Sequence, residues 1–282
     1  MTLPEVSERD MKLPGGRVVH TFDTGGDSGA SGLAVLWHHG SPQTGALPDP
    51  LRAAAADRGI RLLCYGRPSY GGSSPHPGRS IGSAASDVAQ IADAAGVDRF
   101  ATMGTSGGGP HALACAALLP DRVVATVTLA GPVPYTSDFD WYAGMVSPQG
   151  PRTAVEGREA RARYAEVEEF DENCFTAADY DALEGAWASM GEDAGRAGRA
   201  GPDGLIDDDV ALMSPWGFDP TKINGPVLLV HGGEDRVIPV SHSEWLVWRL
   251  STAELWLRPS DGHISVLHAV PVALDWLIAH RP

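Results

Sequence analysis

Short apolar runs alternate with longer amphipathic stretches along the first part of the chain. Apolar runs of this length, bounded by turn residues, predict β-strands, and the stretches between them have the length of helices. Strands that alternate with helices indicate an α/β fold with a mostly parallel sheet covered on both faces. The predicted strands are Arg17–Phe22, Leu33–Trp37, Arg61–Tyr65, Phe100–Met103 and Val123–Ala130, and the predicted helices are Pro48–Arg58, Ile81–Ala95 and the stretch that ends at Leu119.

The alternation stops after Gly131 and returns near the C-terminus. Between Tyr135 and Lys222 the pattern is helical, acidic and rich in Ala. We therefore expect a core domain formed by residues 1–134 and 223–282, with residues 135–222 inserted as a helical cap. Such an insertion usually covers the carboxyl edge of the sheet, where folds of this class bind ligands. The elements predicted after the insertion are strands Pro226–Val230 and Glu254–Leu257 and helices Ser241–Leu250 and Ser265–Ala279.

Composition and charge narrow the classes of function. The chain has 282 residues, 43 % hydrophobic and 20 % charged, which is typical of a globular protein. Its formal net charge of −15 argues against binding to nucleic acid or to anionic membranes, because both require clustered Lys and Arg. The expected cap alone carries 19 Asp and Glu against 7 Lys and Arg, which favours neutral or cationic substrates over anionic ones.

Signals for targeting, metals and cofactors are missing from the sequence. The N-terminal residues lack the basic start and apolar run of a signal peptide, and no apolar stretch approaches the ~20 residues of a membrane helix, so we expect a cytoplasmic protein. The three cysteines Cys64, Cys115 and Cys174 are widely spaced and imply no disulfide framework. Without CxxC, HExxH, Walker A or GxGxxG patterns, we predict neither a metal nor a nucleotide or other cofactor.

The segment Gly104-Thr105-Ser106-Gly107-Gly108 carries the strongest chemical signal. It fits G-x-S-x-G and lies between a predicted strand and a predicted helix. A serine on a sharp strand-to-helix turn projects its hydroxyl from the sheet edge, and flanking glycines keep side chains out of its way. The Gly107 amide would begin the helix and could donate to an oxyanion. The alternative is a glycine-rich turn in which Ser106 only caps the helix.

An acid and a base are expected after the two C-terminal strands. Asp235 lies in the turn after the first of them, where it can orient an imidazole, and Glu234 is its rival. His263 lies in the loop between the last strand and the final helix, and Gly262 gives it room to reach inward. We predict Ser106 as nucleophile, His263 as base and Asp235 as the acidic partner of His263.

Other polar and aromatic residues have weaker contexts. His231 is expected to be structural, and His111 lies on the helix that follows Ser106. The run Asp207-Asp208-Asp209 suggests a metal or amine site, although a solvated loop or a helix start is the simpler interpretation. We expect the aromatic residues of the cap either to line an apolar pocket or to form the core of the cap itself. We favour the core of the cap for most of them. They are Phe139, Trp141, Tyr142, Phe170, Trp187 and Trp216.

Taken together, these motifs resemble the α/β-hydrolase superfamily over about residues 16–134 and 223–280. The order Ser106, Asp235, His263 is the order of that family's catalytic triad. The turn from residue 65 to 73 is similar to the family's G-x-G-x-S turn, with Arg67-Pro68 as a departure. The subgroup it resembles is the capped one, which contains esterases, proline-iminopeptidase-like enzymes, carbon–carbon bond hydrolases and cofactor-free haloperoxidases. A serine nucleophile separates the chain from haloalkane dehalogenases and epoxide hydrolases, which use aspartate.

The resemblance also implies a second oxyanion donor and a reaction. In this family the loop after the second predicted strand supplies that donor, and here the Ser41 amide takes the place beside Gly107. His38 and His39 are then expected to hold this loop by hydrogen bonds. The implied activity is acyl transfer from a small carboxylic ester, with a small-molecule substrate and no cofactor. Amide or peptide cleavage, carbon–carbon bond hydrolysis and a non-catalytic ligand receptor stay open, and the substrate-binding residues and oligomeric state are not predicted.

Overall fold

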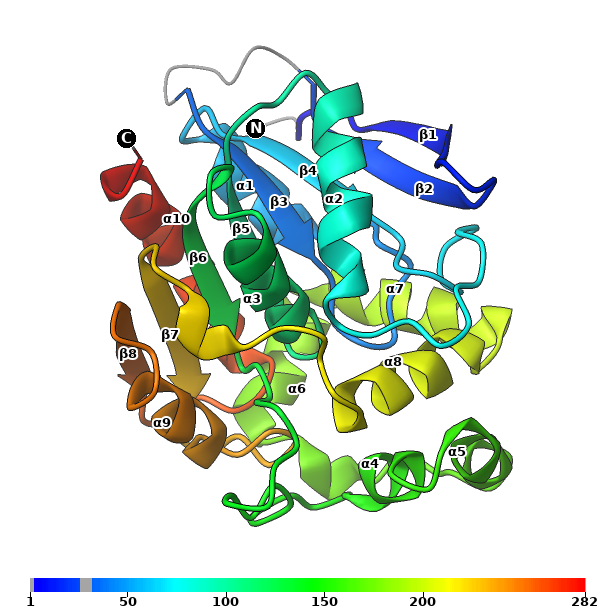
Figure 1. Ribbon diagram of the computed structural model, residues 1–282. Coiled ribbons are helices and arrows are strands. Elements are labelled where there is room, and N and C mark those ends of the chain that lie inside the picture. The colour runs from blue at the N-terminus through cyan, green and yellow to red at the C-terminus, as the bar shows by residue number, and fades with distance from the viewer. Residues whose placement is uncertain (1–2, 26–31, 282) are drawn as a thin grey trace.

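One twisted sheet forms the centre of the molecule. Within residues 3–25 and 32–281, which the computed structural model describes, eight strands pair in the order β1-β2-β4-β3-β5-β6-β7-β8 (Figure 1). β2 pairs antiparallel with β1 and with β4, and the other neighbouring pairs are parallel, which confirms the mostly parallel sheet. The strands are β1 (Ser7–Lys12), β2 (Val18–Asp23), β3 (Ala34–His38), β4 (Arg61–Tyr65), β5 (Phe100–Thr105), β6 (Val123–Leu129), β7 (Val227–Gly232) and β8 (Ala253–Arg258).

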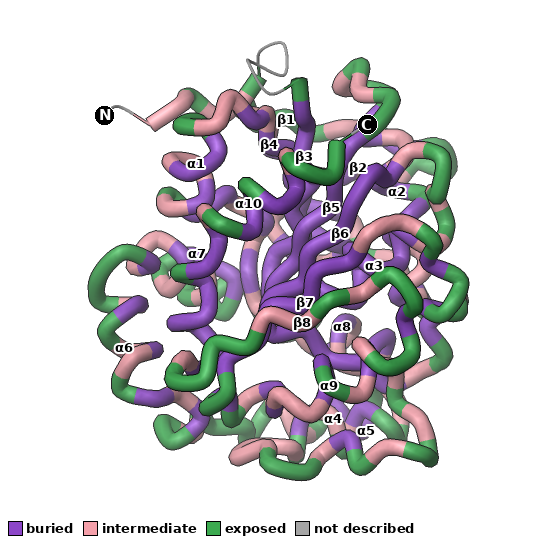
Figure 2. Tube along the Cα trace, turned by 90° about the vertical axis from the view of Figure 1, so that its left-hand side faces the viewer, coloured by how far each residue is buried: buried purple, intermediate pink, exposed green. Residues whose placement is uncertain are grey.

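Two groups of helices cover the two faces of the sheet. α1 (Asp49–Ala56) and α10 (Val270–Ala279) pack on one face, and α2 (Ser83–Ala94), α3 (Gly108–Leu118) and α9 (Ser241–Val247) pack on the other. Figure 2 shows the central strands buried between these helices. Burial on both faces explains why the central strands are continuous apolar runs rather than alternating ones.

Strand β3 illustrates how one strand serves both faces. Val35 and Trp37 belong to the apolar cluster that includes α1 and α10, whereas Ala34 and Leu36 belong to the cluster that includes α2 and α3. Successive side chains of a strand point to opposite faces, so each face receives every second residue. The strand ends at the loop that contains Ser41.

The first strand, β1, is missing from the sequence-based prediction. Its side chains are almost all polar and exposed, and it pairs only with β2 at the edge of the sheet. An edge strand held by backbone hydrogen bonds needs no apolar pattern, and the hydrophobic periodicity therefore gives no sign of it.

Between β6 and β7 the chain leaves the sheet and forms a set of helices. We call residues 135–222 the helical insertion. Its helices lie mainly beyond the end of the sheet at which the parallel strands stop (Figure 1). α4 and α5 pack against each other and against α8, whereas α6 packs against α7 and η3. The elements of the insertion are α4 (Gln149–Ala154), α5 (Arg158–Ala165), η1 (Glu172–Cys174), α6 (Ala177–Glu184), α7 (Ala188–Ala200), α8 (Asp203–Met213) and η2 (Pro220–Lys222). The short helix η3 (Ser265–Ala269) lies outside the insertion and follows β8.

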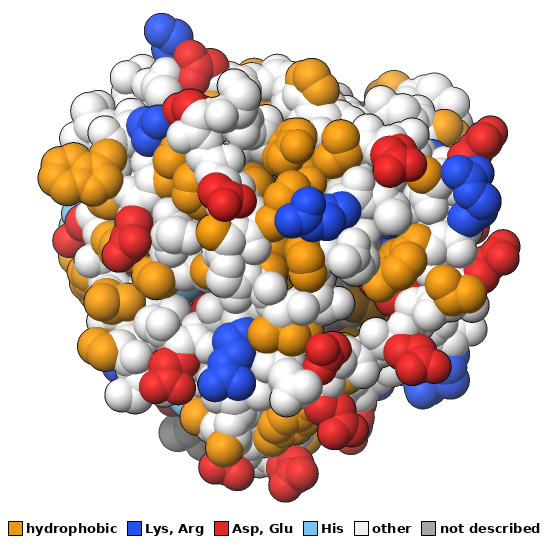
Figure 3. All heavy atoms as spheres, turned by 90° about the horizontal axis from the view of Figure 1, so that it is seen from below, with side chains coloured by type: hydrophobic (Ala, Val, Ile, Leu, Met, Phe, Trp, Pro, Cys, Tyr) orange, Lys and Arg blue, Asp and Glu red, His pale blue; other side chains and the backbone are white. Residues whose placement is uncertain are grey.

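The outer face of the molecule below the sheet carries carboxylates scattered among apolar side chains (Figure 3).

Asp207, Asp208 and Asp209 do not lie in a solvated loop. They lie inside α8, and Asp208 is buried, so the expectation of a solvated loop or helix start is wrong.

Among the described residues, no helix combines the length and the apolar character needed to cross a membrane.

Candidate active site

Ser106 lies where β5 passes into α3. Its φ of +50° is in the left-handed region, which residues other than glycine rarely adopt. Its amide donates to the Leu129 carbonyl oxygen at 2.8 Å, and its own carbonyl oxygen accepts from the Gly109 amide at 2.9 Å. A β-carbon on Gly104 would lie only 2.3 Å from the Gly108 carbonyl oxygen, so strand and helix approach more closely than a side chain would allow. The sharp turn expected around Ser106 is present.

The side chains of Ser106, His263 and Asp235 form a continuous hydrogen-bonded chain. His263 Nε2 lies 3.0 Å from Ser106 Oγ, and His263 Nδ1 lies 2.8 Å from Asp235 Oδ2. The three residues follow strands β5, β8 and β7, respectively, so the three strand ends bring together residues far apart in sequence. His263 and Asp235 are buried, whereas Ser106 is half-buried and open to a ligand.

Asp235 is held as an acceptor for the imidazole. Its Oδ1 accepts from the amides of Val237 and Ile238, both at 2.9 Å. Its Oδ2 lies 2.8 Å from His263 Nδ1 and 3.4 Å from His231 Nε2. Burial raises the pKa of Asp235, but the charge of His263 and the hydrogen bonds from His231 and His263 lower it by more. The resulting pKa of Asp235 lies well below the usual value. The carboxylate is therefore ionised at neutral pH. The rival Glu234 is exposed.

The loop that carries His263 is held by Asp179 of α6. Oδ1 of Asp179 accepts from the amides of Ile264 and Ser265, both at 2.8 Å, and from the Ser265 hydroxyl at 2.9 Å. Burial lowers the pKa of His263, but the charge and hydrogen bond of Asp235, together with the charge of Asp179, raise it above its usual value. Asp179 is not among the site residues that the sequence predicts. Its local signal, a capping box with Thr176, marks only the start of α6.

The loop after β3 places Ser41 against Gly107. A β-carbon on Gly107 would lie 2.7 Å from Ser41 Oγ and 3.9 Å from the Ser41 amide nitrogen. The Ser41–Pro42 peptide bond is cis. The two residues predicted as oxyanion donors therefore lie side by side, next to Ser106.

His39 forms hydrogen bonds that hold this loop, whereas His38, the last residue of β3, joins the end of the strand to α3. His39 Nδ1 lies 2.7 Å from the Gly40 carbonyl oxygen, and its Nε2 accepts from the Arg67 amide at 3.1 Å. His38 Nε2 lies 3.6 Å from Cys115 Sγ. Burial, together with the charge of Arg67, lowers the pKa of His38 to about 3, so this ring is neutral at physiological pH.

Two further histidines near the site have local partners. His111 donates from Nδ1 to the Gly107 carbonyl oxygen at 2.8 Å, and burial lowers its pKa well below the usual value. His231 lies 2.7 Å from both the Ser243 hydroxyl and the Ile238 carbonyl oxygen. Neither ring lies between Ser106 and an acid, so of these rings only His263 joins Ser106 to a carboxylate.

A cavity of about 180 Å³ opens beside Ser106. Both Ser41 and Gly107 line it, and Trp141 forms part of its apolar wall. Trp141, Trp187 and Trp216 are all buried among core residues. The other apolar lining residues include Ile81, Met145, Leu205, Leu212 and Ile238.

The charged wall of the cavity comes from the helical insertion. Arg161 donates from Nε to Asp209 at 2.6 Å, and its Nη2 lies 2.7 Å from a Glu168 carboxylate oxygen. Burial raises the pKa of Asp209 to about 6, although Arg161 opposes this. Asp208 also lines the cavity. The wall therefore consists of ion-paired groups rather than free charges.

The three aspartates of the run in α8 form four ion pairs with arginines. Asp207 pairs with Arg158, Asp208 with Arg67 and Arg79, and Asp209 with Arg161. Within the described part of the chain, no group of three or more His, Cys, Asp or Glu side chains is placed to hold a metal ion. The run thus joins α8 to its neighbours through ion pairs.

The geometry agrees with a comparison against protein families. The sequence model of the alpha/beta hydrolase fold matches residues 34–269, which is most of the chain. The chain belongs to the α/β-hydrolase fold family. This confirms the family expected from the motifs around Ser106, Asp235 and His263.

Solved structures of several α/β-hydrolases share the fold. A bromoperoxidase from Bacillus anthracis is 22 % identical with a TM-score of 0.74, over 98 % of this chain and 100 % of the other. A thermophilic esterase from Thermogutta terrifontis is 19 % identical with a TM-score of 0.71, over 98 % and 100 %. The enol-lactonase from Burkholderia xenovorans is 19 % identical with a TM-score of 0.70, over 95 % and 99 %. At these identities the likeness shows the fold of this α/β-hydrolase and not its substrate.

Proposed function

We propose that this α/β-hydrolase is a serine hydrolase that cleaves a small carboxylic ester. The observation that carries the proposal is the chain of hydrogen bonds from Ser106 through His263 to Asp235, beside a cavity of about 180 Å³. A hydroxyl bonded to an imidazole, which is in turn oriented by a carboxylate, is the arrangement that activates serine as a nucleophile. Esterases and an enol-lactonase with the same fold are consistent with this choice.

The reaction proceeds in two steps. His263 Nε2 takes the proton from Ser106 Oγ as that oxygen attacks the ester carbonyl carbon, and Asp235 stabilises the resulting imidazolium. His263 then gives the proton to the departing alcohol, which leaves an acyl group on Ser106. Water, deprotonated by His263, attacks the acyl-enzyme, releases the acid and restores the serine.

The negative oxygen of each tetrahedral intermediate needs donors that are fixed in advance. The amides of Gly107 and Ser41 are our candidates, because these residues lie side by side next to Ser106. Loss of one such donor costs on the order of 3–4 kcal/mol of transition-state stabilisation. The half-buried position of Ser106 lets a substrate carbonyl approach both amides from the cavity.

The helical insertion acts in this proposal as the cap that selects substrates. Residues Trp141, Met145, Leu205 and Leu212 of the insertion line the cavity together with Ser106 and Ser41. The small volume favours short acyl groups and small alcohols over long chains. We therefore expect acetate and butyrate esters to react faster than octanoate esters.

An amide or peptide hydrolase of the aminopeptidase kind would need a free carboxylate to bind the substrate amine. The carboxylates of Glu168 and Asp209 line the cavity, but Arg161 already pairs with both. Their pairing favours an ester without a charged amine. A ligand receptor on the same fold would bind a small molecule tightly without turning it over.

The test is hydrolysis of nitrophenyl acetate, butyrate and octanoate by the wild type, Ser106→Ala and Ser86→Ala. Ser86 is an exposed serine on α2 and serves as the matched control. We expect wild-type turnover to be kept in Ser86→Ala and to fall by about 10³-fold or more in Ser106→Ala. Full turnover by Ser106→Ala would overturn the mechanism, and tight ligand binding without turnover by the wild type would favour the receptor.

A further inference from the structure

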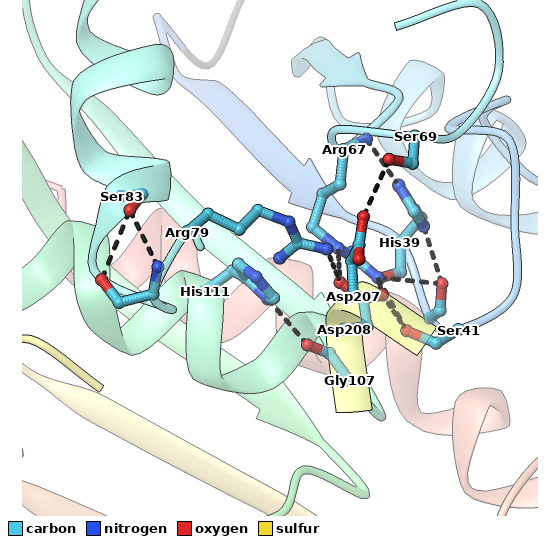
Figure 4. Close-up of polar contacts among 12 residues, drawn as sticks. His39, Ser41, Arg67, Ser69, Arg79, Ser83, Gly107, His111, Asp207 and Asp208 are labelled. Carbon is cyan, nitrogen blue, oxygen red and sulfur yellow. Dashed lines mark hydrogen bonds and ion pairs between the residues drawn. The ribbon is translucent and has the colours of Figure 1, made fainter. Parts of the chain in front are cut away.

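A buried polar cluster joins the helical insertion to the loop that carries Ser41 (Figure 4). The Ser41 hydroxyl donates to Oδ2 of Asp208, which lies on α8, 167 residues further along the chain. Arg67, which follows β4, donates from Nη2 both to Ser41 Oγ at 2.8 Å and to Asp208 Oδ2 at 2.6 Å. Ser41, Arg67 and Asp208 thus form a closed triangle of hydrogen bonds.

Arg67 also holds the backbone of the same loop. Its Nη1 donates to the His39 carbonyl oxygen and its Nη2 to the Gly40 carbonyl oxygen at 3.3 Å, while its own amide donates to the His39 ring. One guanidinium therefore contacts three consecutive residues, of which the last, Ser41, supplies the proposed oxyanion donor. The planar fork of arginine suits this role, because its donors are fixed relative to one another.

The cluster contains three buried charged side chains, those of Arg67, Arg79 and Asp208. Arg79 donates to Oδ1 of Asp208 at 2.6 Å, so that one carboxylate bridges two guanidinium groups. The side chains of Arg67, Arg79 and Asp208 are only 1 %, 3 % and 6 % exposed. Buried ion pairs of this kind are weak contributors to stability compared with apolar packing, and their clearest use is to fix one arrangement of parts.

We propose that Asp208 and Arg67 are positioning residues that hold the Ser41 amide in the oxyanion site, so that docking of α8 completes the catalytic machinery. The inference rests on the proposed function, because it assigns these residues to transition-state stabilisation in that reaction. Neither residue touches the reacting atoms. Both act through the loop at Ser41, which α8 holds from the side of the insertion and Arg67 holds from the side of the sheet.

A positioning role for Asp208 and Arg67 predicts different effects on kcat and on KM. An oxyanion donor interacts far more strongly with the tetrahedral intermediate than with the planar ester carbonyl. A displaced Ser41 amide should therefore lower kcat and leave KM almost unchanged. A purely structural role of Asp208 would lower the fraction of folded protein, but it would not change the turnover of each folded molecule.

The experiment compares Asp208→Asn with Asp207→Asn, measuring kcat and KM per active site titrated with a fluorophosphonate. Asp207 is the matched control: it lies beside Asp208 on α8 and accepts from Arg158 and Ser69, but it does not contact the Ser41 loop. We expect Asp208→Asn to lower kcat by about 10- to 100-fold with KM within about twofold of the wild type. The Asp207→Asn values should match the wild type.

Ser41→Ala tests the same contact without removing a charge, and it leaves the ion pairs of Arg67, Arg79 and Asp208 in place. Its kcat should fall while its KM stays near the wild-type value. The double variant Ser41→Ala/Asp208→Asn should lose no more kcat than Asp208→Asn alone, because both changes break one linkage. Wild-type kcat per active site in Asp208→Asn would overturn the proposal. If Asp208→Asn does not fold, unchanged kcat in Ser41→Ala would overturn it.

The rate of fluorophosphonate labelling tests the positioning role without any ester substrate. The phosphonyl oxygen occupies the oxyanion site as Ser106 displaces fluoride, so labelling should slow in Asp208→Asn and not in Asp207→Asn. A wild type that is labelled at Ser106 but hydrolyses no ester would contradict the proposed ester substrate alone. Equal labelling rates in all three proteins would contradict the positioning role alone.

Discussion

The Ser41 hydroxyl oxygen lies so close to Gly107 that a β-carbon at position 107 would come within 2.7 Å of it. Two loops that are separate in sequence therefore meet with no side chain between them, and the amides of both residues remain next to Ser106. The contact depends on glycine, because a Cβ at position 107 would force the Ser41 hydroxyl out of its hydrogen bonds with Arg67 and Asp208, which hold the loop.

Gly107→Ala should lower kcat by about 10- to 100-fold, because the displaced Ser41 amide no longer donates to the oxyanion. Steady-state kinetics with a nitrophenyl ester measure this loss, and KM should change little. Gly198→Ala is the matched control, since Gly198 is exposed on α7 and a β-carbon there meets nothing within 4 Å. The control should keep full activity and gain about 0.5 kcal/mol of stability. Equal activity of the two variants would contradict the close contact at Gly107.

The pH dependence of kcat/KM should report the ionisation of His263. The base must be neutral, and the charge and hydrogen bond of Asp235 outweigh burial and raise the His263 pKa above its usual value of about 6.5. Activity should therefore rise with pH through an apparent pKa above 6.5. A profile that is flat between about pH 5 and 9 would exclude a histidine base.

Asp235→Asn should move this acid limb to lower pH and reduce kcat by about 10³- to 10⁴-fold. Without the carboxylate charge, burial dominates and the pKa of His263 falls. An asparagine can also donate its amide to Nδ1 and so select the wrong tautomer. Glu234→Gln is the control, because Glu234 is exposed and should leave both the rate and the pH profile unchanged.

Asp179→Asn should weaken the loop that follows His263. Its Oδ1 accepts three hydrogen bonds from Ile264 and Ser265, and its charge helps to raise the His263 pKa. We expect kcat to fall by about 10-fold or more and the acid limb to move to lower pH. Asp181→Asn, at an exposed position on α6, should alter neither. An unchanged pH profile in Asp179→Asn would show that its charge does not act on the base.

Asp208 should also leave a signature in the pH dependence of stability. Burial raises its pKa, but Arg67 and Arg79 lower it by more, so its folded-state pKa lies well below the unfolded value of about 3.9. Its ion pairs therefore contribute fully above about pH 4, and the contribution is lost as the pH falls further. Removing one partner of a buried pair costs about 3–5 kcal/mol, so Asp208→Asn should be less stable than the wild type by that amount at pH 7.

Urea unfolding of the two proteins at a series of pH values measures this difference. The gap in the free energy of unfolding should be constant between about pH 5 and 8 and should narrow below about pH 4. A gap that stayed the same down to pH 3 would show that the ionised carboxylate of Asp208 is not the source of the stability.

Ser106, Asp235 and His263 could be found from sequence because each carries a local signal. Each follows a predicted strand, and a parallel sheet brings the carboxyl ends of its strands to one edge. The glycines around Ser106 and Gly262 before His263 mark the close turns. The order of β5, β7 and β8 in the sheet then brings the three side chains within hydrogen-bonding distance.

The residues that support this chain could not be found in the same way. Arg67 reaches Asp208 across 141 positions, and Asp179 reaches Ile264 across 85, so neither pair shares a local pattern. Asp208 stands in a run of three aspartates that reads as a solvated segment, because sequence does not show which of the three faces inward. In the sequence Arg67 stands out only as a departure from the family's turn, and its contacts with the Ser41 loop arise from the fold.

We expect Ser106 to form a covalent acyl-enzyme, which can be detected from the mass of the protein after rapid acid quenching. Wild type mixed with nitrophenyl butyrate should gain the mass of one butyryl group, and peptide fragmentation should place that group on Ser106. His263→Ala should acquire it far more slowly, and Ser106→Ala should not acquire it. A butyryl group on another residue, or turnover at the wild-type rate by Ser106→Ala, would contradict the account.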